Sequence, residues 1–389
     1  MTEPTFARRP WYVRFPLVLW QYFVGVLLCQ FMLGAVVVVG WTTRLMQRQI
    51  LSTWWKKSPL RQQGGSFHDF TATLPNQCTL RTLPNWCLAE PQQASPLQAA
   101  AGGRIRRTLR RVFGSLNLNF RQGATAALSI FIFTLPATSL WLYSWVLGWN
   151  ISFFKLYEQS SLGILLGLFG ILLFILAMLY VPLAHARQAV TGQWRTFFDL
   201  RTNWRFARRH PVVMLPAAIL FVVASEVVML LRIAPYFIGT QEQFVAMSVE
   251  QLRQWLDNYH LAAGMLLLPA YVLVWMAVAN AYARAAVREF VSAAEDCPLG
   301  TAERHALANL QYQPQAAPTS SHTLLRGTSW TLGRFATTAA LGLICLAWFG
   351  VAAQVFVAQF FNYIPGASWL NHPLVLLPWI KYIPPGLTP

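Results

Sequence analysis

Six long apolar segments separated by short polar stretches limit most strongly how this 389-residue chain can fold. A helix needs about 20 apolar residues to cross roughly 30 Å of hydrocarbon, and each segment reaches that length. The segments are also too long and uninterrupted for ordinary buried strands. The sequence therefore predicts an all-α integral membrane bundle of about six transmembrane helices, at residues 17–41, 124–149, 161–184, 211–235, 260–283 and 335–361.

The composition agrees with a bilayer environment. Hydrophobic residues make up 56% of the chain and charged residues 11%, whereas a soluble domain carries about 25% charged residues. The net charge of +17 arises from Lys and Arg residues that flank the apolar segments. Anionic head groups and the positive-inside rule account for such residues. We therefore expect the lipid bilayer and its anionic lipids as partners, and no nucleic acid.

Arginine is concentrated in alternate gaps between the apolar segments, which predicts the orientation. Residues 42–123 hold twelve Lys and Arg against two acids, residues 185–210 hold six arginines against one acid, and residues 284–334 hold five arginines. Each of the other gaps holds a single basic residue. Cytoplasmic loops carry the excess of positive charge, so six crossings place both termini outside.

The N-terminal charges conflict with this orientation. Arg8, Arg9 and Arg14 precede the first apolar segment and would face the outside. In an alternative topology, residues 1–41 form a re-entrant or interfacial element, which leaves five crossings and an N-terminus inside. The apolar run is longer than the apolar core of a signal peptide, so we expect it to be retained.

These features divide the chain into four parts. An N-terminal tail with the first helix (1–41) precedes a basic cytoplasmic loop (42–123), in which residues 62–103 have the composition of a weakly ordered linker. A five-helix membrane core (124–361) follows. The tail at 362–389 is apolar but interrupted by prolines, and we expect it to lie along the outer surface or to cover the bundle.

Two basic amphipathic segments, 104–122 and 193–209, adjoin the core on the predicted cytoplasmic side. Each combines apolar side chains with surrounding arginines, a pattern typical of helices at a membrane surface. Contacts with anionic lipids are therefore predicted for Arg106, Arg107, Arg110, Arg111, Arg205, Arg208 and Arg209.

One acidic residue, Glu226, lies inside an apolar segment, where a carboxylate must be paired or protonated. At 1.5 Å per residue, Glu226 lies about 13 Å below the outer end of its helix, Gln354 about 10 Å and Ser139 about 15 Å. These depths allow a Glu226–Gln354–Ser139 cluster facing the bundle interior. The cluster is either a proton or cation site in a conduit, or a neutral carboxylic acid that joins helices. The lack of companion charges favours the second interpretation.

Small residues predict close helix packing. Gly163 and Gly167 form a G-x-x-x-G pattern that Gly170 extends, and we expect the partner helix in the same chain. Prolines inside four segments predict kinks, at Pro136, Pro182, Pro216 and Pro269.

A short internal similarity links two helix ends. AHARQAV (184–190) and AYARAAV (281–287) agree at five of seven positions, each at the predicted cytoplasmic end of a helix. Two copies of one helical hairpin would produce this pattern. Chance would also produce it, because Ala and Arg are common at such ends.

No catalytic or cofactor motif is visible. The sequence lacks a nucleophile elbow, a P-loop, an H-E-x-x-H motif and EF-hand spacing. Its seven histidines are scattered, and Cys78 and Cys87 lack the paired spacing of a zinc site. We therefore expect no enzymatic activity, no cofactor and no metal.

Three stretches carry a family resemblance: PWYVRF (10–15) with GWTTRLMQRQ (40–49), GWNISFFKLYEQ (148–159), and YVPLAHARQAVTGQWRTFFDLRTNWRFARR (180–209). Over roughly residues 10–240, the chain resembles a family of bacterial multi-pass membrane proteins known only as a domain of unknown function. The resemblance implies a helical protein of the bacterial inner membrane. It supplies no catalytic or binding residues.

Two functions remain open on these observations. The first is a non-enzymatic scaffold or accessory subunit that packs against a membrane-protein partner. The second is a transporter or lipid-handling protein that uses Glu226. A continuous polar cavity reaching Glu226 would favour the second, whereas a solid bundle with an exposed packing surface would favour the first.

Overall fold

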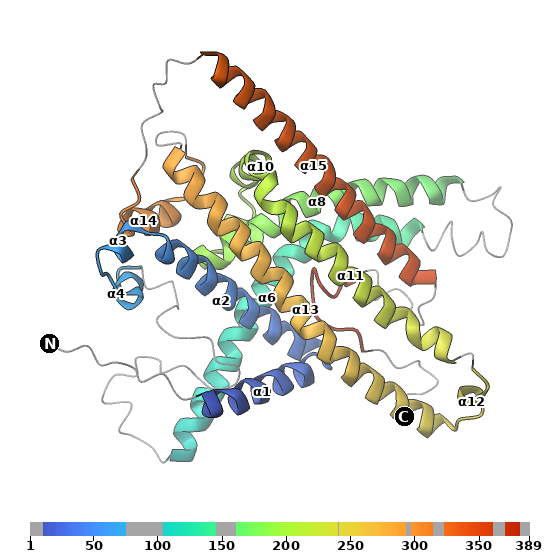
Figure 1. Cartoon of the computed structure of the whole chain (residues 1–389). Helices are drawn as coiled ribbons and strands as arrows, with labels where there is room; N and C mark the ends of the chain where they lie inside the picture. The colour runs from blue at the N-terminus through green and yellow to red at the C-terminus, as the bar shows by residue number, and fades with distance from the viewer. Residues whose placement is uncertain are drawn as a thin grey trace.

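The structure, a computed structural model, describes residues 11–74, 104–144, 161–239, 241–292, 297–313, 323–360 and 370–381. Its seven long helices are α1 (Trp11–Leu28), α2 (Met32–Lys56), α6 (Arg104–Ser144), α8 (Ser161–Thr191), α11 (Pro211–Gly239), α13 (Val249–Ser292) and α15 (Thr323–Phe360) (Figure 1). Short helices lie between them: α3 (Pro59–Gln62), α4 (Phe67–Ala72), α9 (Trp194–Phe197), α10 (Leu200–Arg209), α12 (Glu242–Val245) and α14 (Thr301–Asn309). These described parts contain no strand, so the predicted all-α class is confirmed.

Five helices are long and apolar enough to cross a membrane, namely Val112–Ser144, Leu162–Thr191, Pro211–Gly239, Val249–Ser292 and Thr331–Val355. Only 33–44% of the most apolar stretch of each is buried inside the protein. The remaining apolar surface suits hydrocarbon, whereas a helix of a water-soluble protein would place polar residues there. The chain is therefore a multi-pass membrane protein, and the five helices match the segments predicted between residues 124 and 361.

The first predicted segment, 17–41, is not one helix. α1 ends at Leu28 and α2 begins at Met32, with a turn between them. Gly34 allows this close turn, because a Cβ at that position would lie 2.3 Å from the carbonyl oxygen of Leu28. The prediction of a continuous helix was wrong because uniformly apolar composition does not reveal such a break.

α2 runs alongside α13 over most of its length. Just before α2, the Gln30 side chain donates to the carbonyl of His260 at 3.2 Å, and near the other end Trp54 donates to the carbonyl of Ala283 at 3.0 Å. Any hydrocarbon layer that covers residues 260–283 of α13 therefore also covers α2. α2 is too polar to count among the five apolar helices, but more than half of its 25 residues are buried by other helices rather than exposed to lipid.

The predicted basic loop 42–123 is largely helical where the structure describes it. α2 continues to Lys56, and α6 begins at Arg104 as a single helix of 41 residues. The amphipathic segment 104–122 is therefore not a separate helix, because it is continuous with the candidate membrane span Val112–Ser144. The linker residues 75–103 lie outside the described parts.

α2 and α6 cross with their backbones in contact. A Cβ at Gly40 would lie 1.8 Å from the carbonyl oxygen of Asn119, and a Cβ at Gly123 would lie 1.9 Å from that of Val36. Beside this crossing, Arg44 of α2 donates to the side chain of Asn119 at 3.0 Å. Sequence analysis did not identify this glycine pair, because the two residues are far apart in the chain and neither belongs to a G-x-x-x-G pattern.

Replacing Gly123 by Ala should destabilise the fold, because the added methyl group forces the two backbones apart. Overpacking of this kind costs about 1–3 kcal/mol of unfolding free energy, which SDS titration of the purified protein would measure. Gly114 of the same helix is the control, since a Cβ there meets nothing within 4 Å. Gly114→Ala should stabilise by roughly 0.5–1 kcal/mol through helix propensity. Equal effects of the two substitutions would contradict the close crossing.

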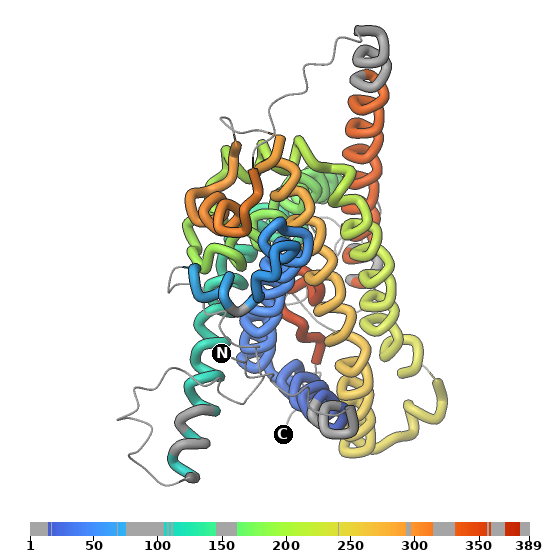
Figure 2. Tube along the Cα trace, turned by 60° about the vertical axis from the view of Figure 1, so that its left-hand side comes forward, coloured from blue at the N-terminus to red at the C-terminus, as the bar shows by residue number. Residues whose placement is uncertain are grey.

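Residues 370–381 enter the bundle instead of lying along its outer surface (Figures 1 and 2). Side chains of α11 and α13 donate to the carbonyls of this non-helical segment: Arg232 to Asn371 at 3.0 Å, Trp275 to Leu374 at 3.0 Å and Tyr271 to Leu376 at 3.4 Å. The segment's end is held by an ion pair between Lys381 and Asp257 at 2.8 Å. The expectation of a surface tail was wrong because five consecutive apolar residues from Pro373 to Leu377 are stabilised more by burial than by exposure.

Asn371 folds this segment upon itself. Its side chain accepts a hydrogen bond from the Leu377 amide at 2.9 Å and donates to the carbonyls of Leu377 and Trp379 at 3.2 and 3.1 Å. These backbone groups are not part of a helix, so no helical hydrogen bond would satisfy them if Asn371 were removed. Buried backbone groups of this kind need a partner within the protein. This residue therefore replaces the hydrogen bonds that a helix would supply.

Substituting Asn371 by Ala should lower the unfolding free energy by about 1–3 kcal/mol, because it leaves buried backbone groups unpaired. Asn117→Ala is the matched control at an exposed position of α6, and it should change stability by less than about 0.5 kcal/mol. Thermal unfolding in detergent, followed by circular dichroism, would measure both. An Asn371→Ala protein as stable as the control would show that the segment does not depend on this residue.

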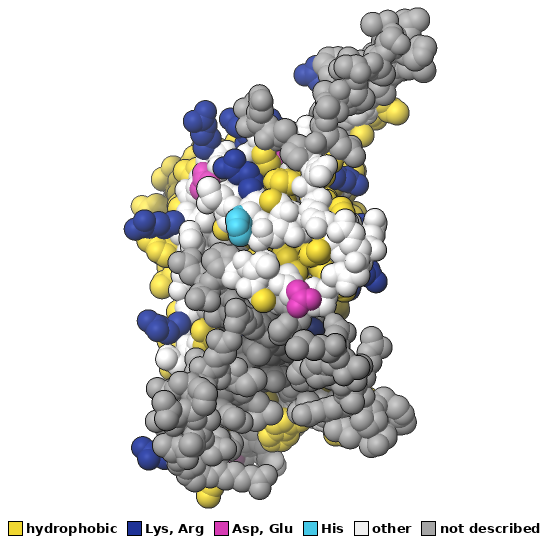
Figure 3. All heavy atoms as spheres, turned by 90° about the vertical axis from the view of Figure 1, so that its left-hand side faces the viewer, with side chains coloured by type: hydrophobic (Ala, Val, Ile, Leu, Met, Phe, Trp, Pro, Cys, Tyr) yellow, Lys and Arg dark blue, Asp and Glu magenta, His cyan; other side chains and the backbone are white. Residues whose placement is uncertain are grey.

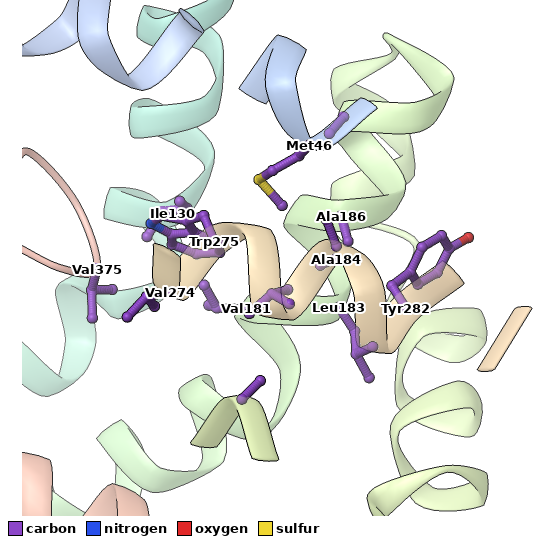
Figure 4. Packing of buried hydrophobic residues seen from close by; sticks show 14 of the residues in the cluster. Met46, Ile130, Val181, Leu183, Ala184, Ala186, Val274, Trp275, Tyr282 and Val375 are labelled. Carbon is purple, nitrogen blue, oxygen red and sulfur yellow. The ribbon is translucent and has the colours of Figure 1, made fainter. Parts of the chain in front are cut away.

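One continuous hydrophobic core joins α2, α6, α8, α11, α13 and α15 to the C-terminal segment (Figure 4). Met46 of α2, Ile130 of α6, Val181 of α8, Trp275 of α13 and Val375 of the C-terminal segment all belong to it. Around this core, α6 packs with α8 and α11 packs with α13 as two hairpins, while α2 covers α6 and α15 covers α11. Consecutive helices pack in this way whether or not they are copies, so the repeat remains a prediction.

Candidate functional site

Two of the three residues in the predicted polar cluster are in contact. The side-chain nitrogen of Gln354 on α15 donates to a carboxylate oxygen of Glu226 on α11 at 2.7 Å. Ser139 of α6 is exposed and makes no hydrogen bond to either residue. Equal depth therefore predicted the contact between Glu226 and Gln354, whose helices are packed together. It did not show that the side chain of Ser139 faces another direction.

Glu226 faces away from the bundle interior, contrary to the expectation, and Gln354 beside it is half-buried. Ser225 points inward and contacts His372 at 3.1 Å, while the adjacent Glu226 is exposed. The rise per residue gives a residue's depth, but each step also turns the helix by about 100°, so depth does not give the direction of the side chain. Exposed apolar residues lie above and below Glu226 on the same face of α11: Ile219, Val223 and Leu230.

Part of this polar pair is without a partner. The side-chain oxygen of Gln354 is buried and accepts no hydrogen bond from the described residues. Neither Gln354 nor Glu226 lines any of the three hollows described below. Because that oxygen is buried, the exposed carboxylate of Glu226 is the part of the pair that can accept a hydrogen bond from a group approaching α11 and α15 from the side.

The predicted glycine stripe packs within the chain. Gly163, Gly167 and Gly170 are all buried, and the Ser144 side chain of α6 donates to the Gly163 carbonyl. A Cβ at Gly170 would lie 2.6 Å from the ring of Trp141 on α6. The stripe thus forms the contact between α6 and α8.

α10 presents a stripe of arginines at the basic end of the bundle, which comprises α10, α14 and the C-terminal end of α13. Arg201, Arg205 and Arg208 follow the i, i+4, i+7 spacing of one helical face, and no acidic side chain of the described residues pairs with them. The opposite face is fully buried at Asn203 and Phe206. Lys and Arg side chains also gather toward the upper edge of the face drawn in Figure 3.

The other predicted lipid contacts differ from this stripe. Arg209 forms an ion pair with Glu289 of α13, which also contacts His210 at 2.7 Å. Arg106 is exposed on α6. The side chains of the remaining three, Arg107, Arg110 and Arg111, lie outside the described parts of the chain.

Two apolar grooves flank α8, and both reach Trp204 of α10. The first has a volume of about 120 Å³ and lies between α8, α11 and α15, with Pro182 and Trp348 in its wall. The second has a volume of about 370 Å³ and lies between α6 and α8, with Pro136 and Tyr180 in its wall. A third hollow above them is lined by the α10 arginines and again by Trp204.

A buried network of ion pairs and hydrogen bonds fixes α10 to the bundle. Arg187 of α8 donates twice to Glu303 of α14, at 3.0 and 3.1 Å, and once to Asn203 of α10 at 2.7 Å. Tyr282 of α13 also donates to Glu303, and Asp199 lies 3.4 Å from Arg187. Four helices therefore meet at one guanidinium group.

Asp199 is both a member of this network and the N-cap of α10, where it accepts from the Thr202 amide at 3.2 Å. Burial raises the pKa of its carboxyl, but hydrogen bonds from Thr202 and the charge of Arg187 lower that pKa by more, so it lies below its usual range. Its contribution to stability is therefore present above the ordinary pKa of aspartate and lost as the pH falls through the lowered value.

Sequence analysis did not predict this network. Arg187 and Arg284 occupy equivalent positions of the similar heptapeptides, yet Arg187 is buried and Arg284 is exposed. Glu303, the partner of Arg187, is one of four acids in the segment 284–334. A single sequence carries no signal that pairs one of those acids with an arginine on another helix.

Replacing Arg187 by Gln should destabilise the protein strongly, because Glu303 is then a buried charge without its partner. Breaking a buried ion pair costs about 3–5 kcal/mol, measurable as a lower unfolding midpoint in SDS. The equivalent substitution Arg284→Gln removes the same charge from an exposed position and should change stability by less than about 0.5 kcal/mol. Similar midpoints for the two variants would contradict a structural role of the network.

The described residues offer no metal site. No three His, Cys, Asp or Glu side chains among them are placed to hold a metal ion. Cys29, Cys297 and Cys345 are free thiols, and Cys78 and Cys87 lie outside the described parts.

Comparison with known protein families, with curated proteins and with solved structures finds no match to this chain. The family resemblance over residues 10–240 therefore stays a prediction.

Proposed function

We propose that this multi-pass membrane protein is a non-enzymatic scaffold or accessory subunit that binds a transmembrane helix of a partner along α11 and α15. The observation that carries the proposal is the outward-facing hydrogen bond between Gln354 and Glu226. The partner helix contributes a hydrogen-bond donor or a basic residue at the depth of this pair.

The cost of exposing a carboxylate to hydrocarbon supports this proposal. Glu226 lies near the middle of α11, fifteen residues after its first residue and thirteen before its last in the apolar stretch Pro211–Gly239. An ionisable residue at the centre of a membrane helix costs about 3 kcal/mol on insertion scales, and such residues usually face protein rather than lipid. A donor on a partner helix that reaches the exposed carboxylate would offset that cost.

The surface around the pair leaves room for a helix to approach closely. On α15, a Cβ at Gly342 or Gly350 would meet nothing within 4 Å. Leu346, between these two glycines, is 63% exposed. Small residues on a membrane helix allow another backbone to come near, and the described residues leave the space beside both glycines open.

The transporter alternative has less support. A conduit that uses Glu226 needs a polar path to it, but Glu226 lines neither of the two apolar grooves nor the arginine-lined hollow described above. The core is filled by the C-terminal segment and by large aromatic side chains, including Trp275. These features fit a rigid bundle that presents a surface.

Site-specific photo-cross-linking in cells tests the proposal. A photoreactive residue at Val223 or Leu230 should give one adduct of defined mass, and Glu226→Leu should remove that adduct. Leu165 and Leu172 of α8 are comparably exposed control positions and should give none. In detergent, Glu226→Leu should leave the melting temperature of the isolated protein unchanged or higher, because the carboxylate is not needed inside the bundle.

Two outcomes would contradict the proposal. Adducts of similar yield at all four positions would indicate random collisions in the membrane. A Glu226→Leu protein that melts several degrees lower but retains its adduct would show that the pair joins helices of one chain only.

A further inference from the structure

The arginine stripe of α10 and the two apolar grooves meet at one junction. Trp204 lines both grooves and the hollow between the arginines, and Arg208 lines the first groove as well as that hollow. The junction lies where α10 leads into the transmembrane helix α11, which begins at Pro211. It therefore lies at the edge of the membrane, with basic residues on one side and apolar grooves on the other.

The grooves have walls suited to hydrocarbon chains. The first is walled by residues such as Leu179, Leu183 and Ile344, and the second by Phe133, Leu173 and Leu176. α8 forms a ridge between them, because it contributes residues to both. Each groove also contains a proline of its helix, Pro182 or Pro136, where a transmembrane helix departs from regular packing.

The charges around the junction select an anion. Arg201, Arg205 and Arg208 extend from one face of α10 without an acidic partner among the described residues. The nearest acids in the fold are already engaged: Asp199 with Arg187, and Glu289 with Arg209. Guanidinium groups bind phosphate oxygens well, often through two parallel hydrogen bonds, and a tryptophan at this level suits the head-group region.

We propose that this junction is a binding site for one diacyl anionic phospholipid. The phosphate contacts Arg201, Arg205 and Arg208, while the two acyl chains lie in the grooves on either side of α8. A free phosphate ion would use only the arginines, and an uncharged lipid only the grooves, so the joint presence of both favours a phospholipid. The site is separate from the Glu226–Gln354 pair and does not depend on partner binding there.

Native mass spectrometry of the full-length protein in detergent tests the site. Titration with dioleoyl phosphatidylglycerol should show one lipid that binds more tightly than the rest. The triple variant R201Q/R205Q/R208Q should weaken that binding roughly 100-fold, the loss expected when three basic residues near a lipid surface are neutralised. Dioleoyl phosphatidylcholine, whose choline group cancels the phosphate charge, should bind the wild-type protein more weakly than phosphatidylglycerol does.

A charge-matched variant controls for general electrostatics. R284Q/R288Q/R304Q removes three exposed arginines of α13 and α14 that line none of the hollows. It should change phosphatidylglycerol affinity less than twofold. Equal loss in both triple variants would reduce the site to nonspecific attraction and overturn the proposal.

Two further probes distinguish a lipid site from a phosphate site. Single-chain lysophosphatidylglycerol should bind at least tenfold more weakly than the diacyl lipid, and inorganic phosphate at millimolar concentration should not displace the diacyl lipid. Phosphate that displaces it fully would show that the arginines alone make the site.

A phosphatidylglycerol with photoreactive groups in its acyl chains locates the chains. In nanodiscs it should label a peptide around Leu173, on the side of α8 that faces α6, and a peptide around Leu341 of α15. The triple variant R201Q/R205Q/R208Q should lose both labels. Two results would contradict the proposed placement: labelling that is unchanged in the variant, or labelling confined to the control position Leu165 near the N-terminal end of α8.

Discussion

Hydrocarbon offers no hydrogen-bond partner, and every polar group held at membrane depth must therefore be satisfied by protein. The long helices meet this requirement through their own backbone. The turn between α1 and α2 meets it partly through Gln30, which donates to the carbonyls of Val26 and His260. The C-terminal segment meets it through Asn371 and through donors on α11 and α13. Irregular backbone is tolerated in this bundle because it is enclosed, and α2 tolerates polar residues for the same reason.

The same requirement makes the unsatisfied polar groups informative. In the Arg187–Glu303 network each charged group has its partners within the chain. The network has a structural role, because its hydrogen bond to Asn203 sets the position of α10. The Glu226–Gln354 pair and the α10 arginines differ, since they face outward and are not fully matched by the described chain. The first lies among exposed apolar side chains and suits a helix of another protein. The second lies above two apolar grooves and suits a lipid with a charged head group.

Some of this architecture could be predicted from sequence, and particular residues show why the rest could not. Apolar length correctly located the helices between residues 124 and 361, and the rise per residue correctly paired Glu226 with Gln354. Depth arguments failed for direction, so the cluster was expected inside and Ser139 was included. Contacts between distant parts of the chain, such as Gly40 with the backbone near Asn119 or Arg187 with Glu303, depend on which helices become neighbours. A hydropathy pattern does not contain that information, and it likewise cannot distinguish an apolar tail on a surface from one inside a bundle.

Hydrogen exchange of the full-length protein in nanodiscs tests most directly whether irregular backbone is enclosed at membrane depth. The amides of Val375, Leu376, Leu377 and Trp379 are hydrogen-bonded within the C-terminal segment. A peptide covering residues 371–381 should therefore exchange as slowly as peptides from the buried centre of α13. Exchange of that peptide as fast as an exposed connection would place the segment in water and contradict the account.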